Sequence, residues 1–158
     1  MSPINFCEIV SKMRVKRDKR DDIFSKMIRA RDGYYCVKCG VKHEETSTGL
    51  HCSHNVPRRY LRLRWTPLNA ISLCFACHHW YGSEPYESGK WLEQYLGKRN
   101  LKLLLTMKQQ KLKITKAVKE DIYTILKGDR ENQLNQLEIG QVYQLRDPIL
   151  ELLKHGKL

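Results

Sequence analysis

The stretch from His51 to His79, HCSHNVPRRYLRLRWTPLNAISLCFACHH, concentrates side chains that can bind a metal or move a proton. It contains the second of two Cys-x-x-Cys pairs, which are Cys36 with Cys39 and Cys74 with Cys77. Four thiolates at this spacing can surround one Zn²⁺ at about 2.3 Å in a closed tetrahedral site. In a reducing compartment, paired cysteines indicate metal rather than disulfides. The sequence therefore predicts a structural zinc site that closes a long loop.

The loop between the two cysteine pairs holds further polar residues. His54 and Asn69 lie inside it, and His78 follows its last cysteine directly. A solitary histidine is more often a surface or hydrogen-bonded residue than a catalyst, so the combination with the cysteine frame is what favours function. His51 and His79 are further candidate ligands. The remaining histidines and cysteines are expected to be unremarkable surface or small buried residues, namely His43, His155, Cys7 and Cys52.

The segment CSHNVPRRYLRLRWTPLNAISLCFACHHWYG resembles the core of the HNH endonucleases, also called ββα-metal or His-Me finger nucleases. His54 matches the first histidine of that motif, Asn69 its asparagine and His78 its final histidine. The chain is most similar to phage recombination endonucleases of the NinG or Rap type, in which a four-cysteine zinc site brackets the HNH residues. The resemblance covers about residues 20 to 127 and is most specific between Cys36 and Gly82.

The resemblance implies an α+β fold with a hairpin that carries the first histidine and a helix that begins near the last one. It implies that His54 is the general base for water, that Asn69 orients the histidine strand, and that His78 holds a catalytic Mg²⁺ or Mn²⁺. Many HNH proteins have Asp where this chain has Ser53, and hard cations prefer carboxylate oxygen. His51 or His79 could supply a ligand instead, and imidazole ligands would favour Mn²⁺, Co²⁺ or Ni²⁺.

The charge balance indicates a polyanionic partner. Lys and Arg number 29 against 17 acidic residues, and the net charge is +12. These numbers favour nucleic acid. The candidate DNA-binding residues are Arg58, Arg59, Arg62 and Arg64, of which the first two are favoured as substrate contacts. Basic runs at residues 12–20 and 98–119 could clamp DNA arms. Tyr60 and Trp65 could stack on unpaired bases, although core packing is favoured for Trp65.

The length of the chain predicts one modest domain, and the patterns along it divide this domain into three parts. These are a basic arm and helix over residues 1–33, a zinc-stabilised nuclease core over 34–97, and a helical extension over 98–158. Start and stop signals predict helices between Asp21 and Gly33, before Gly97, from Thr115 through Leu126 with Gly128 beyond, and after Asp147 with Pro148 in its first turn. The apolar faces after residue 98 would serve either a homodimer or an intramolecular core.

These observations together predict a metal-dependent DNA endonuclease. The resemblance alone implies that it cuts branched or structured DNA such as recombination intermediates. The alternatives are a general HNH nickase, a site-specific endonuclease, or a non-catalytic DNA-binding module organised by zinc. We expect no membrane association, because the longest aliphatic run is far shorter than the roughly 20 residues of a spanning helix. The start of the chain lacks the apolar core of a secretory signal, so a cytoplasmic location in the host of a phage or prophage is expected.

Overall fold

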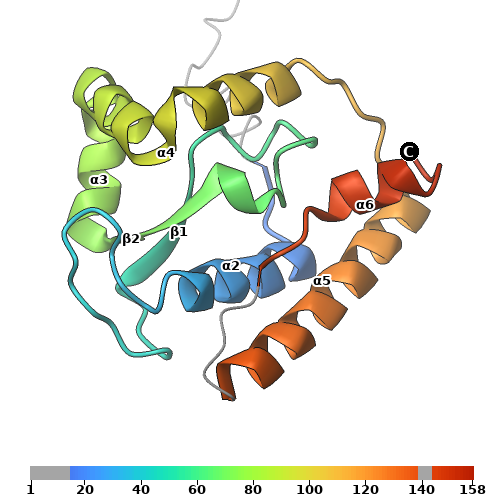
Figure 1. Cartoon of the computed structure of the whole chain (residues 1–158), viewed down its shortest axis with the longest axis horizontal. Coiled ribbons are helices and arrows are strands. Elements are labelled where there is room, and N and C mark those ends of the chain that lie inside the picture. The colour runs from blue at the N-terminus through green and yellow to red at the C-terminus, as the bar shows by residue number, and fades with distance from the viewer. Residues whose placement is uncertain (1–14, 139–143) are drawn as a thin grey trace, which may run out of the picture.

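The computed structural model describes residues 15–138 and 144–158. This part of the chain is a small α+β structure with five α-helices and one antiparallel two-stranded sheet (Figure 1). Strand β1 spans Leu50–His54 and strand β2 spans Ala70–Cys74, and they pair from Leu50 opposite Cys74 to His54 opposite Ala70. The expected α+β class is thus confirmed, and His54 lies on a strand of an antiparallel pair as expected. Cys7 and the first part of the basic run at 12–20 lie outside the described residues.

Helix α2, Lys19–Arg31, lies along one side of the sheet (Figure 1). Its first turn is fixed by a capping box, in which the side chains of Asp18 and Asp21 satisfy backbone N–H groups that the helix leaves without partners. Phe24, Met27 and Ile28 follow at helical spacing and are almost fully buried. The helix predicted between Asp21 and Gly33 is confirmed.

Helices α3, Phe75–Ser83, and α4, Pro85–Lys108, follow the sheet, and α3 contacts both strands. The prediction that a helix ends at Gly97 is confirmed. Gly97 adopts φ 78° and ψ 152°, which breaks the helical geometry, so α4 consists of two helical parts that meet at a kink there, and the second part runs on to Lys108. A residue without a Cβ tolerates this conformation.

Helix α5 spans Lys116–Glu138 and helix α6 spans Pro148–Lys154. The prediction that a helix stops near Gly128 is wrong, because α5 continues for ten residues beyond it while Gln133 donates to the Met27 carbonyl of α2. The start of α6 is as predicted: Asp147 caps it and Pro148 lies in its first turn. No helix in the described ranges is both long and apolar enough to cross a membrane.

The main core lies between α2, the sheet and the last two helices. Phe24 and Met27 share this cluster with Ile122, Leu126 and Ile149. The apolar faces of α5 and α6 are therefore used, at least in part, inside the chain. The homodimer remains a prediction.

Candidate functional site

The four paired cysteines come together in one cluster. The metal-binding atoms of Cys36, Cys39, Cys74 and Cys77 all lie within 4.8 Å of one another, and the Sγ atoms of Cys39 and Cys74 are 3.7 Å apart. A tetrahedral zinc with bonds of about 2.3 Å requires sulfur atoms about 3.8 Å apart. The donor set and its dimensions therefore fit a metal such as zinc.

The local backbone explains how the cluster forms. Cys36 and Cys39 belong to a tight turn, which Gly40 closes by donating its N–H to the Cys36 carbonyl at a φ of 75°. Cys74 ends β2 and Cys77 lies in the first turn of α3. Burial raises the pKa of Cys36, but hydrogen bonds from nearby backbone N–H groups outweigh it and lower the pKa to about 7. These N–H groups stabilise the thiolate, which is the form that binds metal.

Cys52 stands apart from this cluster, as predicted. Burial raises its pKa to about 12, so its thiol stays protonated at neutral pH. It packs against the main core.

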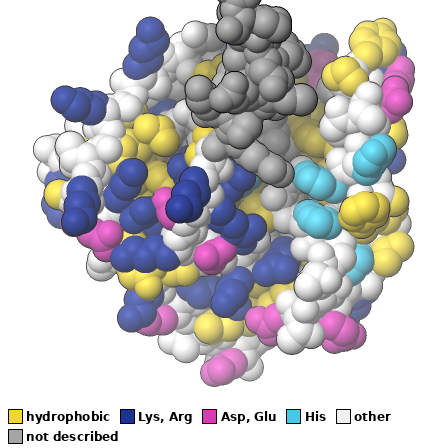
Figure 2. All heavy atoms as spheres, turned by 180° about the vertical axis from the view of Figure 1, so that it is seen from behind, with side chains coloured by type: hydrophobic (Ala, Val, Ile, Leu, Met, Phe, Trp, Pro, Cys, Tyr) yellow, Lys and Arg dark blue, Asp and Glu magenta, His cyan; other side chains and the backbone are white. Residues whose placement is uncertain are grey.

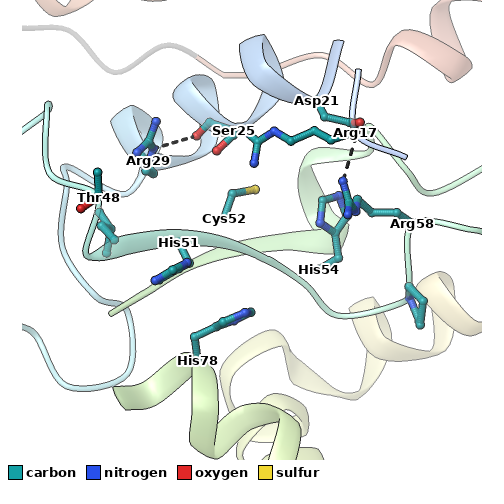
Figure 3. Close-up of a pocket in the computed structure, with 12 residues that line it drawn as sticks. Arg17, Asp21, Ser25, Arg29, Thr48, His51, Cys52, His54, Arg58 and His78 are labelled. Atoms are coloured by element: carbon teal, nitrogen blue, oxygen red, sulfur yellow. Dashed lines mark hydrogen bonds and ion pairs between the residues drawn. The ribbon is translucent and has the colours of Figure 1, made fainter. Parts of the chain in front are cut away.

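A second site is a cavity of about 690 Å³ beside β1, here called the histidine cavity (Figure 3). His54 reaches it from β1, His78 from α3, and several polar residues from α2 and the chain just before it. Its lining consists of Arg17, Asp21, Ser25, Arg29, Thr48, Leu50, His51, Cys52, His54, Pro57, Arg58 and His78. Three of the predicted histidines thus meet in one place, and the exposed His79 does not line it.

Sequence reasoning missed the contribution of α2 to the histidine cavity. Asp21, Ser25 and Arg29 of α2 line it at intervals of four residues, and Arg17, which precedes the helix, continues the same interval. This spacing puts side chains on one face of a helix, next to the apolar face that the pattern already revealed. A polar stripe at that spacing was therefore the available signal.

His54 is held in a defined tautomer. Its Nε2 lies 2.8 Å from the backbone carbonyl oxygen of Arg64. Because a carbonyl can only accept, Nε2 carries the proton and Nδ1 is left with a free lone pair. Burial lowers the pKa of His54, an effect that outweighs the opposing influence of the Arg64 carbonyl. The imidazole is therefore neutral at physiological pH and can accept a proton.

His78 and His51 form a second histidine feature, between α3 and β1. Nδ1 of His78 shares a 3.0 Å hydrogen bond with the Ser53 hydroxyl, which leaves Nε2 for another partner. The ring of His51 stacks on that of His78 with centroids 5.0 Å apart. Nε2 of His51 is buried and has no hydrogen-bond partner among the residues described. Burial, followed by the positive charge that His51 can carry, lowers the pKa of His78. A neutral His78 imidazole beside the unpartnered nitrogen of His51 suits a bound cation.

Asn69 is fully buried and fixes the loop between the two strands. Its side chain donates to the carbonyls of Val56 (2.9 Å) and Leu63 (3.1 Å) and accepts from the Val56 N–H (2.7 Å). Val56 lies two residues after His54, and Leu63 immediately precedes the carbonyl that holds His54. The side chain of Asn69 is thereby placed to set the position of that histidine through the backbone.

The four predicted DNA-binding arginines lie in different environments. Arg58 lines the histidine cavity and Arg59 is exposed. Arg62 and Arg64 are buried, each about 5% exposed, and bond to Asp147 and Asp21 respectively. Their predicted role as phosphate contacts is therefore corrected to an internal one. The carboxylates that pair with them are far away in the sequence, which is why the spacing alone suggested a surface.

Trp65 is also internal, as favoured. It is fully buried and donates its indole N–H to Asp21.

Lys and Arg side chains gather on one face of the molecule, beside the histidines (Figure 2). Comparisons of the chain with protein-family models, curated proteins and solved structures find no match. The class that the fold and the sites define is a small α+β protein whose four-cysteine cluster could hold a metal such as zinc. A separate cavity is lined by three histidines together with Arg17, Arg29 and Arg58.

Proposed function

We propose that this protein is a metal-dependent endonuclease that hydrolyses phosphodiester bonds in branched or structured DNA. One observation carries the proposal: His54 and His78, from different elements, line a single cavity together with Arg29 and Arg58. Phosphodiester cleavage needs a base for water and positive charge around the phosphate, and this lining offers both. The net charge of +12 suits the same substrate. The preference for branched DNA rests on the resemblance to the NinG and Rap nucleases.

In the proposed reaction His54 accepts a proton from the attacking water at Nδ1. The Arg64 carbonyl keeps the other ring nitrogen protonated, so the imidazole cannot turn its donor towards the water without losing a 2.8 Å hydrogen bond. Arg58 and Arg29 would bind the non-bridging phosphate oxygens, because guanidinium groups pair well with phosphate. Asn69 would hold β1 and His54 in position relative to these two arginines.

A divalent ion is expected at His78 and His51. The unpartnered Nε2 of His51 and the remaining nitrogen of His78 are suitable donors, and Ser53 orients the His78 ring through Nδ1. Such an ion, when bound, neutralises charge that develops on the phosphate and the leaving oxygen. Imidazole donors favour Mn²⁺ or another transition metal over Mg²⁺. Zinc at the four cysteines would anchor the start of α3 and so the position of His78, one residue beyond Cys77.

A second candidate function is a non-catalytic, zinc-organised DNA-binding module. The observation that favours it is Ser53, which lies where many HNH proteins carry a metal-binding Asp and instead bonds to His78. Such a module would bind DNA through the same Lys- and Arg-rich face, and His54 would not act as a base.

The test is cleavage of a labelled four-way junction, a matched linear duplex and a single strand, in Mg²⁺ and in Mn²⁺. We expect the unmodified protein to cut the junction and His54→Ala to lose cutting while it still binds. His79→Ala, a change of the same kind at an exposed position outside the cavity, is the matched control and should cut normally. Salt-sensitive binding without cleavage under either metal would favour the DNA-binding module. A fixed cut in linear duplex would instead indicate a site-specific enzyme.

A further inference from the structure

A second cavity of about 780 Å³ lies between α2, α5 and the loop at residues 45–48, and we call it the α2–α5 cavity. It adjoins the histidine cavity, since Arg29 and Thr48 line both. Its full lining is Ile23, Lys26, Arg29, Tyr34, Glu45, Thr46, Ser47, Thr48, Tyr123, Lys127, Arg130, Glu131 and Leu134. A chain-like ligand that enters the histidine cavity could therefore continue across Arg29 into this second space.

We propose that the α2–α5 cavity binds an unpaired nucleic-acid strand that continues from the phosphate held in the histidine cavity. This inference rests on the proposed function and adds to it a site for the strand beside the cut. Single-stranded nucleic acid offers phosphates together with the apolar faces of its bases, and sites for it combine cationic with aromatic side chains. The α2–α5 cavity has cationic and aromatic side chains together, whereas a site for phosphate alone would need only polar ones.

The charges of this cavity suit a polyanion. Four cationic side chains line it against two acidic ones, Glu45 and Glu131. Lys26 of α2 and Lys127 of α5 are exposed and make no ion pair with any described residue. Arg29 uses its Nε on the Ser25 carbonyl of its own helix, so its charge likewise has no acidic partner there. These three cations remain available for phosphate oxygens.

The walls of the α2–α5 cavity also contain apolar and aromatic side chains. Ile23 and Tyr123 come from helices that pack on each other through the main core, and Tyr34 comes from the turn after α2. Gln133 of α5 accepts from Arg130 at 2.8 Å and donates to the Met27 carbonyl of α2 at 2.9 Å. The two helices are thereby fixed relative to each other, so the space between them is formed before a ligand arrives. A preformed site loses less conformational entropy on binding.

The test is binding of fluorescent DNA to the zinc-loaded full chain without added Mg²⁺ or Mn²⁺, which keeps binding separate from cleavage. The probes are a duplex with a single-stranded extension of about ten nucleotides, a length typical of single-strand sites, and the same duplex with blunt ends. The double variant Lys26→Ala, Lys127→Ala removes the two unpaired cations. Its control, Lys154→Ala with Lys157→Ala, removes the same charge from residues that line neither cavity.

We expect the Lys26/Lys127 variant to bind the extended duplex about tenfold more weakly, and its dependence on log salt to fall by about 1.4, as expected for two lost contacts to a single strand. Blunt duplex binding and the control variant should change little. Equal losses for both probes or for both variants would overturn the proposal, as would no loss. Competition by an acidic peptide as effective as that by the oligonucleotide would replace nucleic acid with a protein partner. If the selective loss is found but no DNA is ever cut, the strand site stands and the nuclease proposal fails.

Discussion

Nε2 of His54 lies 2.8 Å from the carbonyl oxygen of Arg64, a residue whose own side chain points into the protein and pairs with Asp21. One arginine thus serves two purposes: its backbone selects the tautomer of the proposed base, and its guanidinium fixes that backbone to α2. The chemistry of the histidine cavity consequently depends on the buried ion pair between Arg64 and Asp21.

Substitution of Asp21 tests how far the site depends on this ion pair. The Asp21 carboxylate accepts from Arg64 at 2.6 and 3.0 Å and from the Trp65 indole at 3.1 Å, and both members of the ion pair are about 5% exposed. Burial raises the pKa of Asp21, but the hydrogen bonds from Arg64 help to hold it below its usual range. Asp21→Ala leaves the buried Arg64 guanidinium with only the more distant Asp18, at 3.7 Å, as an acidic partner. We therefore expect it to lower the free energy of unfolding by about 3 to 5 kcal/mol.

Urea denaturation at neutral pH measures this loss. Asp22→Ala provides the matched control, since Asp22 is 58% exposed and pairs with an equally exposed Arg17. Its substitution should change stability by less than about 1 kcal/mol. Similar losses at the two neighbouring positions would contradict the role assigned to Asp21.

The pKa of His54 predicts a pH profile. Burial is the main cause that lowers it below the ordinary 6.5. We expect the rate of cleavage to rise with pH as His54 loses its proton, with a midpoint below 6.5 and no further rise near neutrality. Single-turnover rates at saturating metal measure the profile. A midpoint above 7 would contradict His54 as the base.

The same shift of the His54 pKa should appear in stability. Between the folded and unfolded pKa values the unfolded chain binds more protons, so this contribution to stability is complete above about 6.5 and is lost as the pH falls through the folded pKa. His54→Gln should remove that part of the pH dependence. Denaturation curves of the two proteins across this range provide the comparison.

Removal of the metal from the four cysteines should unfold the surrounding core. Structural zinc in finger peptides contributes roughly 10 to 16 kcal/mol, and little apolar core surrounds this cluster. Cys39→Ser is the informative change because Cys39 is exposed, so any loss reflects the metal rather than packing. We expect it to lose bound zinc and the tertiary near-ultraviolet signal. Cys52→Ala, which removes a thiol outside the cluster, should retain one zinc per chain, and retention of zinc by Cys39→Ser would be inconsistent with a four-cysteine site.

The second metal can be assigned by comparing two histidines of β1 and α3. His51→Ala should weaken binding of Mn²⁺ to the zinc-loaded protein by at least about tenfold, in view of the effect that even outer-shell changes have on metal affinity. His79→Ala should leave the affinity unaltered, since His79 does not line the histidine cavity. Electron paramagnetic resonance of free Mn²⁺ reports the affinity directly. Equal affinities for both variants would exclude His51 as a ligand.

Features that depend on local sequence were predicted correctly. The start of α6 follows from Asp147 and Pro148, and the cysteine cluster follows from two pairs whose spacing already matches a metal site. The helical stripe of Phe24 and its neighbours likewise places α2. Each of these signals lies within a few residues of the structure that it determines, so no knowledge of the rest of the chain was needed.

Features that depend on distant partners were not predicted. Arg62 and Arg64 are followed by no nearby acid, and their partners are 85 and 43 residues away. Gly128 signals a helix end, yet the contacts of Gln133 with α2 outweigh the roughly 1 kcal/mol that a glycine costs inside a helix. The α2 side of the histidine cavity was missed for the same reason, because only the fold brings it opposite β1.

The contact between Arg62 and Asp147 has a consequence for biosynthesis. Asp147 caps α6 and also accepts from Arg62 and Thr66, which belong to the loop that Asn69 fixes behind His54. During translation that loop emerges long before Asp147 does, and until then the Arg62 guanidinium lacks this acidic partner and has only the neutral side chains of Thr66 and Gln110 to bond. We therefore expect chains released by a stop at residue 146 to bind zinc normally, yet to hold the proposed base in a looser and less active arrangement.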